Sequence, residues 1–305
     1  MTTQKKLKLY KQWWFWGALA IFAAIVYVVT NTEQLTSETF DGDREIHPYT
    51  REIGSGTRTA FTEVTGLVDE EGDDIISATA TVQNSTNAIT QTVASDPHGI
   101  SYISLGSLND SVKALAVDHV EPTNENIQSG DYQLYRNFNV MHGQELSEVA
   151  QDFWDFMFSA QAQALVEESG FVPVDSNAPD YVAPGLSGSI TVVGSTSVEP
   201  VMQRFAEEYT KYNPDVTIDI TSPGSGAGIT TTSDGSSDIG MSSREVSEEE
   251  AAQLVNTSSI AIDGIVMIVN KQNTVESIDY EDIRRIYLAD YELPNTWNDI
   301  INKIK

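Results

Sequence analysis

The chain has 305 residues, and 40% of them are hydrophobic, so it is long enough to form one large domain or two smaller ones around apolar cores. A formal net charge of −28, with only 17 lysines and arginines, excludes a nucleic-acid-binding protein, because a phosphate backbone is bound by a concentrated basic surface. The absence of cysteine excludes disulfides, thiolate metal sites, cysteine nucleophiles and a lipid-modified N-terminal cysteine.

The N-terminal region predicts a membrane anchor. Residues 13–30 are almost wholly apolar, residues 1–12 before them are basic, and the stretch after them is acidic, a pattern that places the N-terminus in the cytoplasm. A cleaved signal peptide is the alternative, which the length of the apolar run and the lack of an Ala-x-Ala-like site disfavour. In both cases the chain beyond residue 31 lies outside the cytoplasm, and we predict a single-pass protein of the cell membrane with an extracytoplasmic binding domain.

Two polar stretches, a stalk at 31–44 and a linker at 177–187 rich in proline, glycine and small residues, delimit two folded segments. In the first segment, periodicity predicts helices at 57–64 and 147–169 and strands at 99–105 and 132–140. In the second segment it predicts strands at 189–193, 216–221, 238–241 and 260–270 and helices at 198–212 and 280–288. Strands that alternate with helices indicate an α/β fold with a mostly parallel sheet.

Three loops share one design, a short run of glycine, serine and threonine between a strand and a helix. They are Gly194–Ser197, Gly224–Gly228 and Gly54–Thr57, and the last begins three residues after Arg51. Each offers unpaired backbone N–H groups, a positive helix end and hydroxyls, which together bind a small oxyanion with few charges. Any one of these loops alone is a turn or a helix cap, but three of them beside an arginine, which is a bidentate donor, predict an oxyanion site.

Other ligands and chemistries fit the sequence less well. None of the loops matches a nucleotide-binding motif, and the chain lacks a Gly-x-Ser-x-Gly elbow or a histidine spaced to activate Ser55 or Ser225. The four histidines, His47, His98, His119 and His142, also lack the spacing of metal ligands. We therefore predict no enzyme activity, no metal and no other cofactor.

Both segments resemble the substrate-binding protein of the phosphate ABC importer. Its first half is similar to three stretches of the second segment, Ile190–Pro200, Pro223–Gly228 and Asp238–Arg244. Its second half is similar to three stretches of the first segment, Arg51–Phe61, His98–Ser104 and Asp110–Leu115. The resemblance covers about residues 47–298. It implies the two-lobed periplasmic-binding-protein fold of type II, an α/β fold with a hinge, preceded here by one transmembrane helix.

The two halves stand in swapped order, which indicates a circular permutation of the family. The resemblance then implies one continuous lobe at 137–268 and a second lobe built from 45–136 plus 269–305, with the linker at the permutation joint. Permutation is plausible where the original termini lie close together. A truncated or misassembled reading frame from a tandem gene, and a dimer that exchanges lobes between chains, are the alternatives.

Matching the family's motifs residue by residue gives the phosphate-binding residues that the resemblance implies: Thr196, Ser197, Ser225, Ser243, Arg51, Ser55, Gly56 and Thr57. At Ser243 the sequence departs from family members that have an aspartate accepting the proton of hydrogen phosphate. Sulfate has no such proton and would leave the acceptor unpaired, so rejection of sulfate depends on this acceptor. With serine at this position, oxyanion binding is predicted more firmly than phosphate specificity. Arg244 is expected to form a salt bridge rather than to contact the anion.

The expected function is that of the substrate-binding component of a phosphate ABC transporter. Its partners are inorganic phosphate, the transporter's permease subunits and, through the N-terminal helix, the membrane. We expect a monomer in which both lobes close on one phosphate. The alternatives are a membrane-tethered phosphate sensor or scaffold, a binder of another tetrahedral oxyanion, and a phosphatase-like enzyme.

Overall fold

The computed structural model describes residues 39–288 and 296–303. The predicted anchor at 13–30, the tail at 1–12 and most of the stalk therefore lie outside the described residues. Within the described ranges, no helix combines the length and apolar character that a membrane-spanning segment requires.

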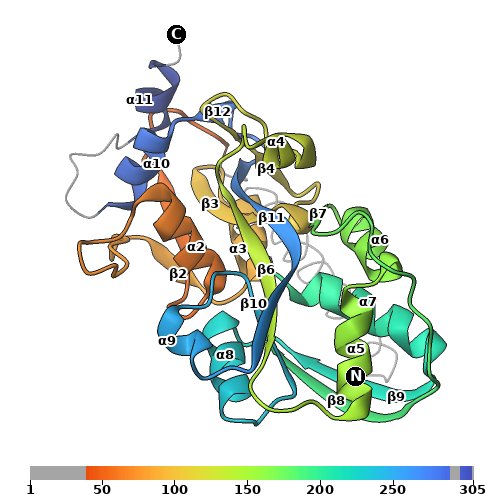
Figure 1. The fold of residues 1–305 in the computed structure, drawn as a ribbon. Helices are drawn as coiled ribbons and strands as arrows, with labels where there is room; N and C mark the ends of the chain where they lie inside the picture. The colour runs from red at the N-terminus through yellow and green to blue at the C-terminus, as the bar shows by residue number, and fades with distance from the viewer. Residues whose placement is uncertain (1–38, 289–295, 304–305) are drawn as a thin grey trace, which may run out of the picture. The chain divides into compact units, whose positions relative to one another are not determined.

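Strands and helices alternate along most of the described chain (Figure 1). The strands are β1 (His47–Arg51), β2 (Thr81–Gln83), β3 (Gly99–Ser104), β4 (Val112–Ala114), β5 (Ala116–Val117), β6 (Tyr135–His142), β7 (Val172–Pro173), β8 (Ser187–Gly194), β9 (Asp215–Thr221), β10 (Ile239–Ser242), β11 (Asn256–Asn270) and β12 (Ser277–Ile278). The helices are α2 (Gly56–Thr65), α3 (Thr86–Ser95), the 3₁₀ helix η1 (Leu105–Ser107), α4 (Asn124–Ser129), α5 (Glu148–Met157), α6 (Ala160–Glu168), α7 (Glu199–Tyr212), α8 (Ser225–Ser233), α9 (Glu248–Ala251), α10 (Tyr280–Tyr287) and α11 (Trp297–Ile301).

The main sheet is mixed, in the order β2-β1-β3-β11-β6-β10-β8-β9, with β4 and β7 also pairing with β11. At each end of the sheet the strands pair in parallel: β1 with β2 and β3, and β8 with β9 and β10. The two central strands, β6 and β11, run antiparallel to each other and to their outer neighbours. A mostly parallel sheet was predicted, and this was wrong at the centre because no crossover helix joins β6 or β11 to a parallel neighbour.

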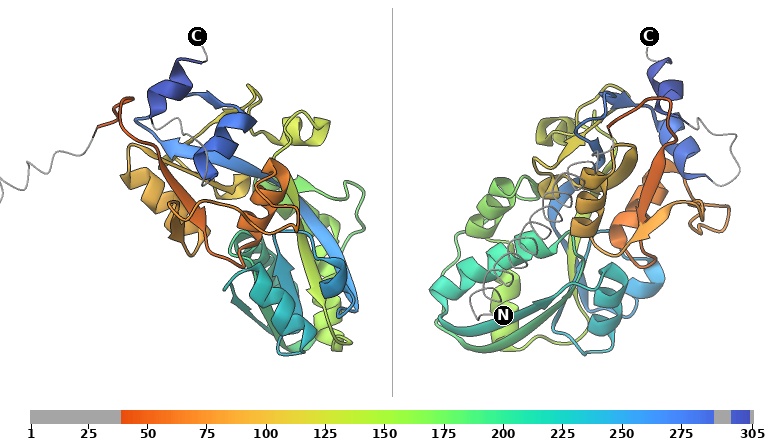
Figure 2. Two further views of the ribbon diagram at one scale, coloured as in Figure 1. Left: turned by 90° about the vertical axis from the view of Figure 1, so that its left-hand side faces the viewer. Right: turned by 180° about the vertical axis from the view of Figure 1, so that it is seen from behind.

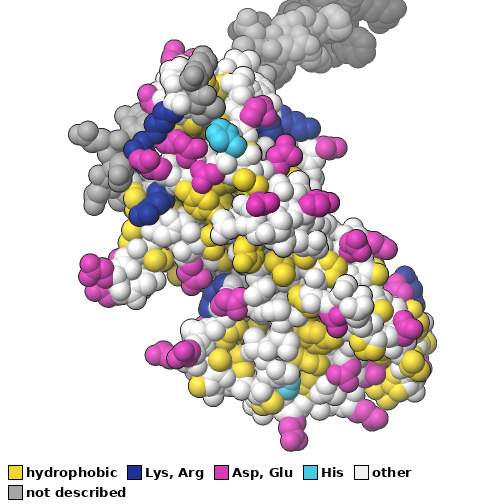
Figure 3. Space-filling model, turned by 45° about the horizontal axis from the view of Figure 1, so that its top comes forward, with side chains coloured by type: hydrophobic (Ala, Val, Ile, Leu, Met, Phe, Trp, Pro, Cys, Tyr) yellow, Lys and Arg dark blue, Asp and Glu magenta, His cyan; other side chains and the backbone are white. Residues whose placement is uncertain are grey.

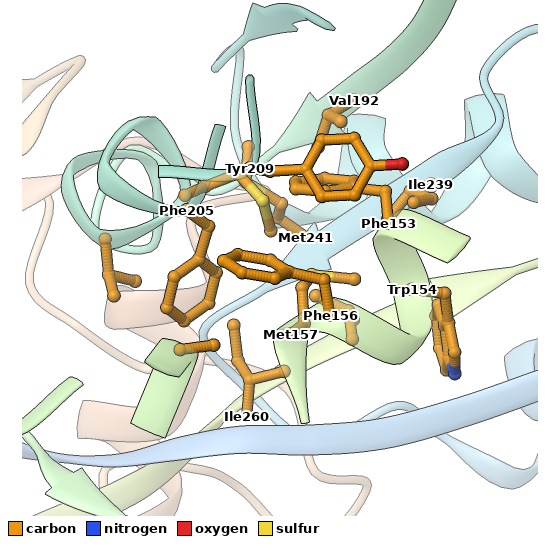
Figure 4. Close-up of a cluster of buried hydrophobic side chains, with 14 of the residues drawn as sticks. Phe153, Trp154, Phe156, Met157, Val192, Phe205, Tyr209, Ile239, Met241 and Ile260 are labelled. Atoms are coloured by element: carbon orange, nitrogen blue, oxygen red, sulfur yellow. The ribbon is translucent and has the colours of Figure 1, made fainter. Parts of the chain in front are cut away.

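Strand β11 links two hydrophobic clusters. Its residues Ile260 and Ala261 belong to a cluster with α5, α6, α7, β8 and β10, where Phe153 and Tyr209 pack edge to face at 5.0 Å between ring centroids (Figure 4). Further along the strand, Ile265 and Met267 belong to a second cluster with α2, β3, α10 and α11. The strand, with β6 beside it, therefore passes from one core to the other (Figures 1 and 2).

Local signals explain where several elements begin and end. The predicted helix at 147–169 is two helices, because Ser159 interrupts it: its hydroxyl donates to the Phe156 carbonyl and accepts from the Ala162 N–H, capping α6. The predicted helix at 57–64 is α2, which ends at Thr65 and is capped by Gly66 with a positive φ of 69°. Residues 177–186, most of the predicted linker, contain no helix or strand.

Candidate oxyanion-binding site

The first predicted loop connects β8 to α7. At its start, Gly194 has a φ of +153°, and a side chain there would lie 2.8 Å from the carbonyl carbon of Met241 and closer still to its oxygen. A glycine is therefore needed for β8 and β10 to approach each other at this edge. Within the loop, Ser195 and Ser197 are buried, and the Ser195 hydroxyl accepts from the Ser197 N–H at 3.1 Å.

The second loop connects β9 to α8 and is bonded to the first. The Gly224 N–H donates to the Gly194 carbonyl at 2.9 Å, and Ser225 opens the helix with its side chain fully buried. The Ser225 hydroxyl accepts from the N–H of Ser243, the residue after β10, at 3.1 Å. Helix α8 packs against β8 and β10 (Figure 2), so the second loop and Ser243 are held at one edge of the sheet.

The third loop connects β1 to α2 and comes from the other side of the linker in sequence. Ser55 is the N-cap of α2, and its hydroxyl accepts from the Arg58 N–H at 3.4 Å. The Gly54 carbonyl accepts from the Gly226 N–H at 3.1 Å. The third loop is therefore in direct contact with the second, although about 170 residues separate them in the chain.

Side-chain hydroxyls from all three loops meet where the loops converge. The Thr57 and Ser197 hydroxyl oxygens are 2.9 Å apart, and the Ser195 hydroxyl donates to Ser243 at 2.8 Å. Ser243 and Ser225 are 3.4 Å apart, and Thr86 at the start of α3 lies 3.2 Å from both Thr196 and Ser197. We call these side chains the hydroxyl cluster: Thr57, Thr86, Ser195, Thr196, Ser197, Ser225 and Ser243. Neutral donors at helix starts suit an oxyanion.

Arg51 supplies the positive charge beside this cluster. Its side chain is only 2% exposed, and its Nε and Nη2 donate to the two carboxylate oxygens of Glu52, each at 2.8 Å. Nη1 donates to Thr86 Oγ1 at 3.2 Å. Glu52 therefore holds one edge of the guanidinium, which leaves the Nη1 side directed toward the hydroxyl cluster.

The end of strand β1, at Thr50 and Arg51, is held by the neutral phenol of Tyr102. The Tyr102 hydroxyl lies 2.6 Å from Thr50 Oγ1 and accepts from the Arg51 N–H at 3.4 Å. Burial raises the pKa of Tyr102 to about 12, and the hydrogen bonds from Thr50 and Arg51 oppose that shift. The phenol therefore carries no charge at neutral pH and adds none to the neighbourhood of Arg51.

The structure brings seven of the eight predicted site residues together, and whether they bind a ligand stays a prediction. Five of them are in the hydroxyl cluster, Gly56 lies against Ser225 and Ser243, and Arg51 reaches the cluster through Thr86. The eighth, Ser55, is buried next to them, but its hydroxyl caps α2 by accepting from the Arg58 N–H and does not join the cluster. Arg244 forms the salt bridge expected of it, donating to both carboxylate oxygens of Glu250 at 2.7 and 2.6 Å. No group of three His, Cys, Asp or Glu side chains in the described ranges is placed to hold a metal ion.

Sequence reasoning missed three residues of this site. Ser195 lies inside the first loop and Glu52 directly follows Arg51, so their positions in the chain were available signals. Thr86 was missed because neither β2 nor α3 was predicted. Its signal was Ser85, a typical N-cap residue whose hydroxyl accepts from the Ala88 N–H at 3.1 Å.

Replacing Gly56 by alanine is expected to weaken oxyanion binding by at least about tenfold, because the third loop could no longer approach the second. A Cβ at this position would lie 2.8 Å from Ser243 Oγ and closer still to Ser225 Oγ. The measurement is calorimetric titration of the purified variant with phosphate.

Gly226→Ala is the matched control for this substitution. Its Cβ would lie 3.5 Å from the nearest atom, the Gly54 carbonyl oxygen, which is ordinary van der Waals contact. Its affinity is expected to stay within about threefold of wild type, since no hydrogen bond is lost. Equal affinities of the two variants would show that close approach of the loops is not needed for binding.

The arrangement defines the class of protein: a mixed α/β chain whose glycine- and serine-rich loops converge at helix starts beside one buried arginine. A family model described as a PBP superfamily domain matches residues 20–161 and 181–304, so the chain belongs to this periplasmic-binding-protein superfamily. Its 42% identity to a phosphate-binding protein places it in the phosphate-binding protein family.

The Phosphate-binding protein PstS 2 of Streptococcus pneumoniae TIGR4 is 42% identical over 258 residues, which cover 84% of this chain and 87% of the relative. A crystal structure of a phosphate ABC transporter's phosphate-binding protein from the same organism matches with a TM-score of 0.68 and 41% identity, covering 84% of this chain and 99% of that one.

The length of the alignment with the streptococcal relative indicates the order of the two halves along the chain. An alignment of 258 residues follows a single chain order, so the streptococcal relative carries its halves in the same order as this chain. The Phosphate-binding protein PstS of Bacillus subtilis is 31% identical over only 103 residues, 33% of this chain and 34% of that protein. The shared order argues against a misassembled reading frame.

Proposed function

We propose that this protein is the substrate-binding component of a phosphate ABC transporter, which captures inorganic phosphate outside the cytoplasm and delivers it unchanged to permease subunits. The observation that carries the proposal is the contact between Thr57 and Ser197, whose hydroxyl oxygens lie 2.9 Å apart although they come from opposite sides of the linker. The 42% identity to a phosphate-binding protein supports phosphate as the ligand. The role is non-enzymatic.

Two lobes that close on the ligand account for this arrangement. We assign one lobe to residues 137–268 and the other to 45–136 with 269–305; the two hydrophobic clusters, which draw mainly on these ranges, support the assignment. Strands β6 and β11 would form the hinge, since they run between the clusters. A ligand held by donors from both lobes favours the closed form, because only that form makes all the contacts.

Short-range hydrogen bonds must provide the affinity. Acidic side chains are scattered over the face seen in Figure 3, and the net charge is −28, so the protein repels an anion at long range. A buried cluster of hydroxyls with one arginine overcomes this repulsion because hydrogen bonds to a desolvated anion are strong.

The remaining parts of the proposal concern location and assembly. Residues 13–30 would anchor the protein in the cell membrane, with the binding lobes outside the cytoplasm and residues 1–12 inside. The chain would act as a monomer, since both sides of the site are contained in one chain.

A second candidate ligand is another tetrahedral oxyanion, such as sulfate, and Ser243 favours it. A serine hydroxyl can donate to an unprotonated oxygen as readily as it accepts from a protonated one, so this position alone does not reject sulfate. The test is calorimetric titration of the full chain in detergent with phosphate and, separately, with sulfate. One-to-one binding of phosphate with no sulfate response supports the proposal; equal binding of both would assign a general oxyanion binder, and binding of neither would refute both.

A further inference from the structure

Thr86 occupies a central position in the hydroxyl cluster. It is the first residue of α3, its side chain is 6% exposed, and its Oγ1 accepts from Arg51 Nη1 at 3.2 Å. The same oxygen lies 3.2 Å from the hydroxyls of Thr196 and Ser197 in the first loop. Thr86 therefore contacts Arg51, which carries the positive charge of the site, and two hydroxyls of the first loop, which belongs to the other proposed lobe.

The hydroxyl of Thr86 is not used to stabilise its own helix. Ser85 caps α3, and Thr90, one turn later, donates its hydroxyl back to the Thr86 carbonyl at 3.1 Å. The contacts of the Thr86 hydroxyl within the described residues are instead with side chains of the site. Its proton can therefore turn toward an anion without costing the helix a hydrogen bond.

The surroundings of Thr86 suit an approaching anion. A groove of about 380 Å³ opens onto the Thr86 and Thr196 edge of the cluster; Asn87 and Gln203 line it, and Glu199 is the one acidic residue among its lining residues. The first turn of α3 contains no acidic residue, so its backbone N–H groups and helix dipole remain favourable to negative charge. Thr86 and Thr196 line this groove, whereas Ser225 and Ser243 do not.

We propose that Thr86 is a direct ligand of the bound phosphate and that the start of α3 is a fourth binding element, beside the three glycine-rich loops. The inference rests on the proposed phosphate-binding function. Thr86 and Arg51 then contact the anion from one lobe while Thr196 and Ser197 contact it from the other. A ligand oxygen accepting from Thr86 and Ser197 bridges the lobes directly, so this contact stabilises the closed form as well as the bound anion.

Thr86→Val tests the proposal, because valine keeps the shape of threonine and removes the hydroxyl. Loss of one hydrogen bond to a charged ligand is expected to weaken phosphate binding by about 10- to 100-fold in calorimetric titration of the full chain. Thr86→Ser, which keeps the hydroxyl, is expected to stay within about threefold of wild type. Thr65→Val is the matched control: Thr65 is similarly buried, its hydroxyl bonds the Phe61 carbonyl of its own helix, and it does not line the groove, so its affinity is expected to be unchanged.

A second experiment separates a direct contact from an effect through Arg51. If Thr86 only positions Arg51, then adding Thr86→Val to Arg51→Gln causes no further loss of affinity; if Thr86 touches the phosphate, the two losses multiply. Wild-type affinity in Thr86→Val, or no further loss in the double variant, overturns the proposal while the phosphate-binding function stands. Absence of phosphate binding in the wild-type protein refutes that function itself, so the two failures are distinguishable.

Discussion

Arg51→Ala is expected to lower the affinity for phosphate by roughly 30- to 5,000-fold, which corresponds to about 2–5 kcal/mol of binding free energy. Arg51 is 2% exposed, and within the described ranges it is the cation whose side chain hydrogen-bonds to the hydroxyl cluster. Without it, the anion is desolvated in a pocket of neutral donors, and Glu52 is left beside it as an unpaired negative charge. Calorimetric titration of the purified full chain with phosphate measures the change.

Arg244→Gln is the control for loss of a positive charge near the site. Arg244 follows Ser243 in the chain, but its guanidinium is bound to Glu250 and to the Glu245 carbonyl. Its substitution is expected to change the affinity by less than about threefold, because a partly exposed ion pair contributes little and touches no ligand donor. If Arg51→Ala bound phosphate as tightly as wild type, the ligand would have to lie elsewhere in the protein.

Asp263→Ala is expected to lower the free energy of unfolding by about 3–5 kcal/mol, because it leaves the charge of Arg136 buried without a partner. Asp263 is fully buried in β11 and accepts from Nε and Nη2 of Arg136, on β6, at 3.1 and 2.9 Å. Its second oxygen accepts from the Ser104 hydroxyl and the Leu105 N–H. Burial raises the pKa of Asp263, and the Arg136 charge opposes that shift. Urea unfolding followed by circular dichroism measures the loss.

The double variant Asp263→Leu with Arg136→Met is the matched comparison. Removing both charges together leaves no uncompensated ion, so its stability is expected to lie much closer to that of wild type than to that of Asp263→Ala. Equal destabilisation of the single and double variants would mean that packing, rather than the ion pair, accounts for the loss. Because the pair joins the two central strands near their passage between the clusters, the same residues would set the stiffness of the proposed hinge.

The sequence by itself identified the family and predicted most residues of the candidate site. The glycine- and serine-rich loops and Arg51 are adjacent in the chain to the strand ends that present them, so local pattern was enough to identify them. The same holds for α2, α7 and α10, whose apolar periodicity marks their buried faces. Helix α3 escaped prediction because its threonines, asparagine and serine are weak helix formers, so its stability depends largely on packing against β3, β11 and β1.

Tertiary structure alone decided how these parts combine. The antiparallel direction of β6 and β11, the pairing of Asp263 with Arg136 and the arrival of Thr86 between Arg51 and Ser197 all depend on residues more than 30 positions apart in the chain. A local pattern reports which face of an element is buried, but it carries no information on which distant element covers that face. The loops were therefore readable from the sequence, whereas the fourth element of the site became visible only when the sheet brought α3 and the first loop together.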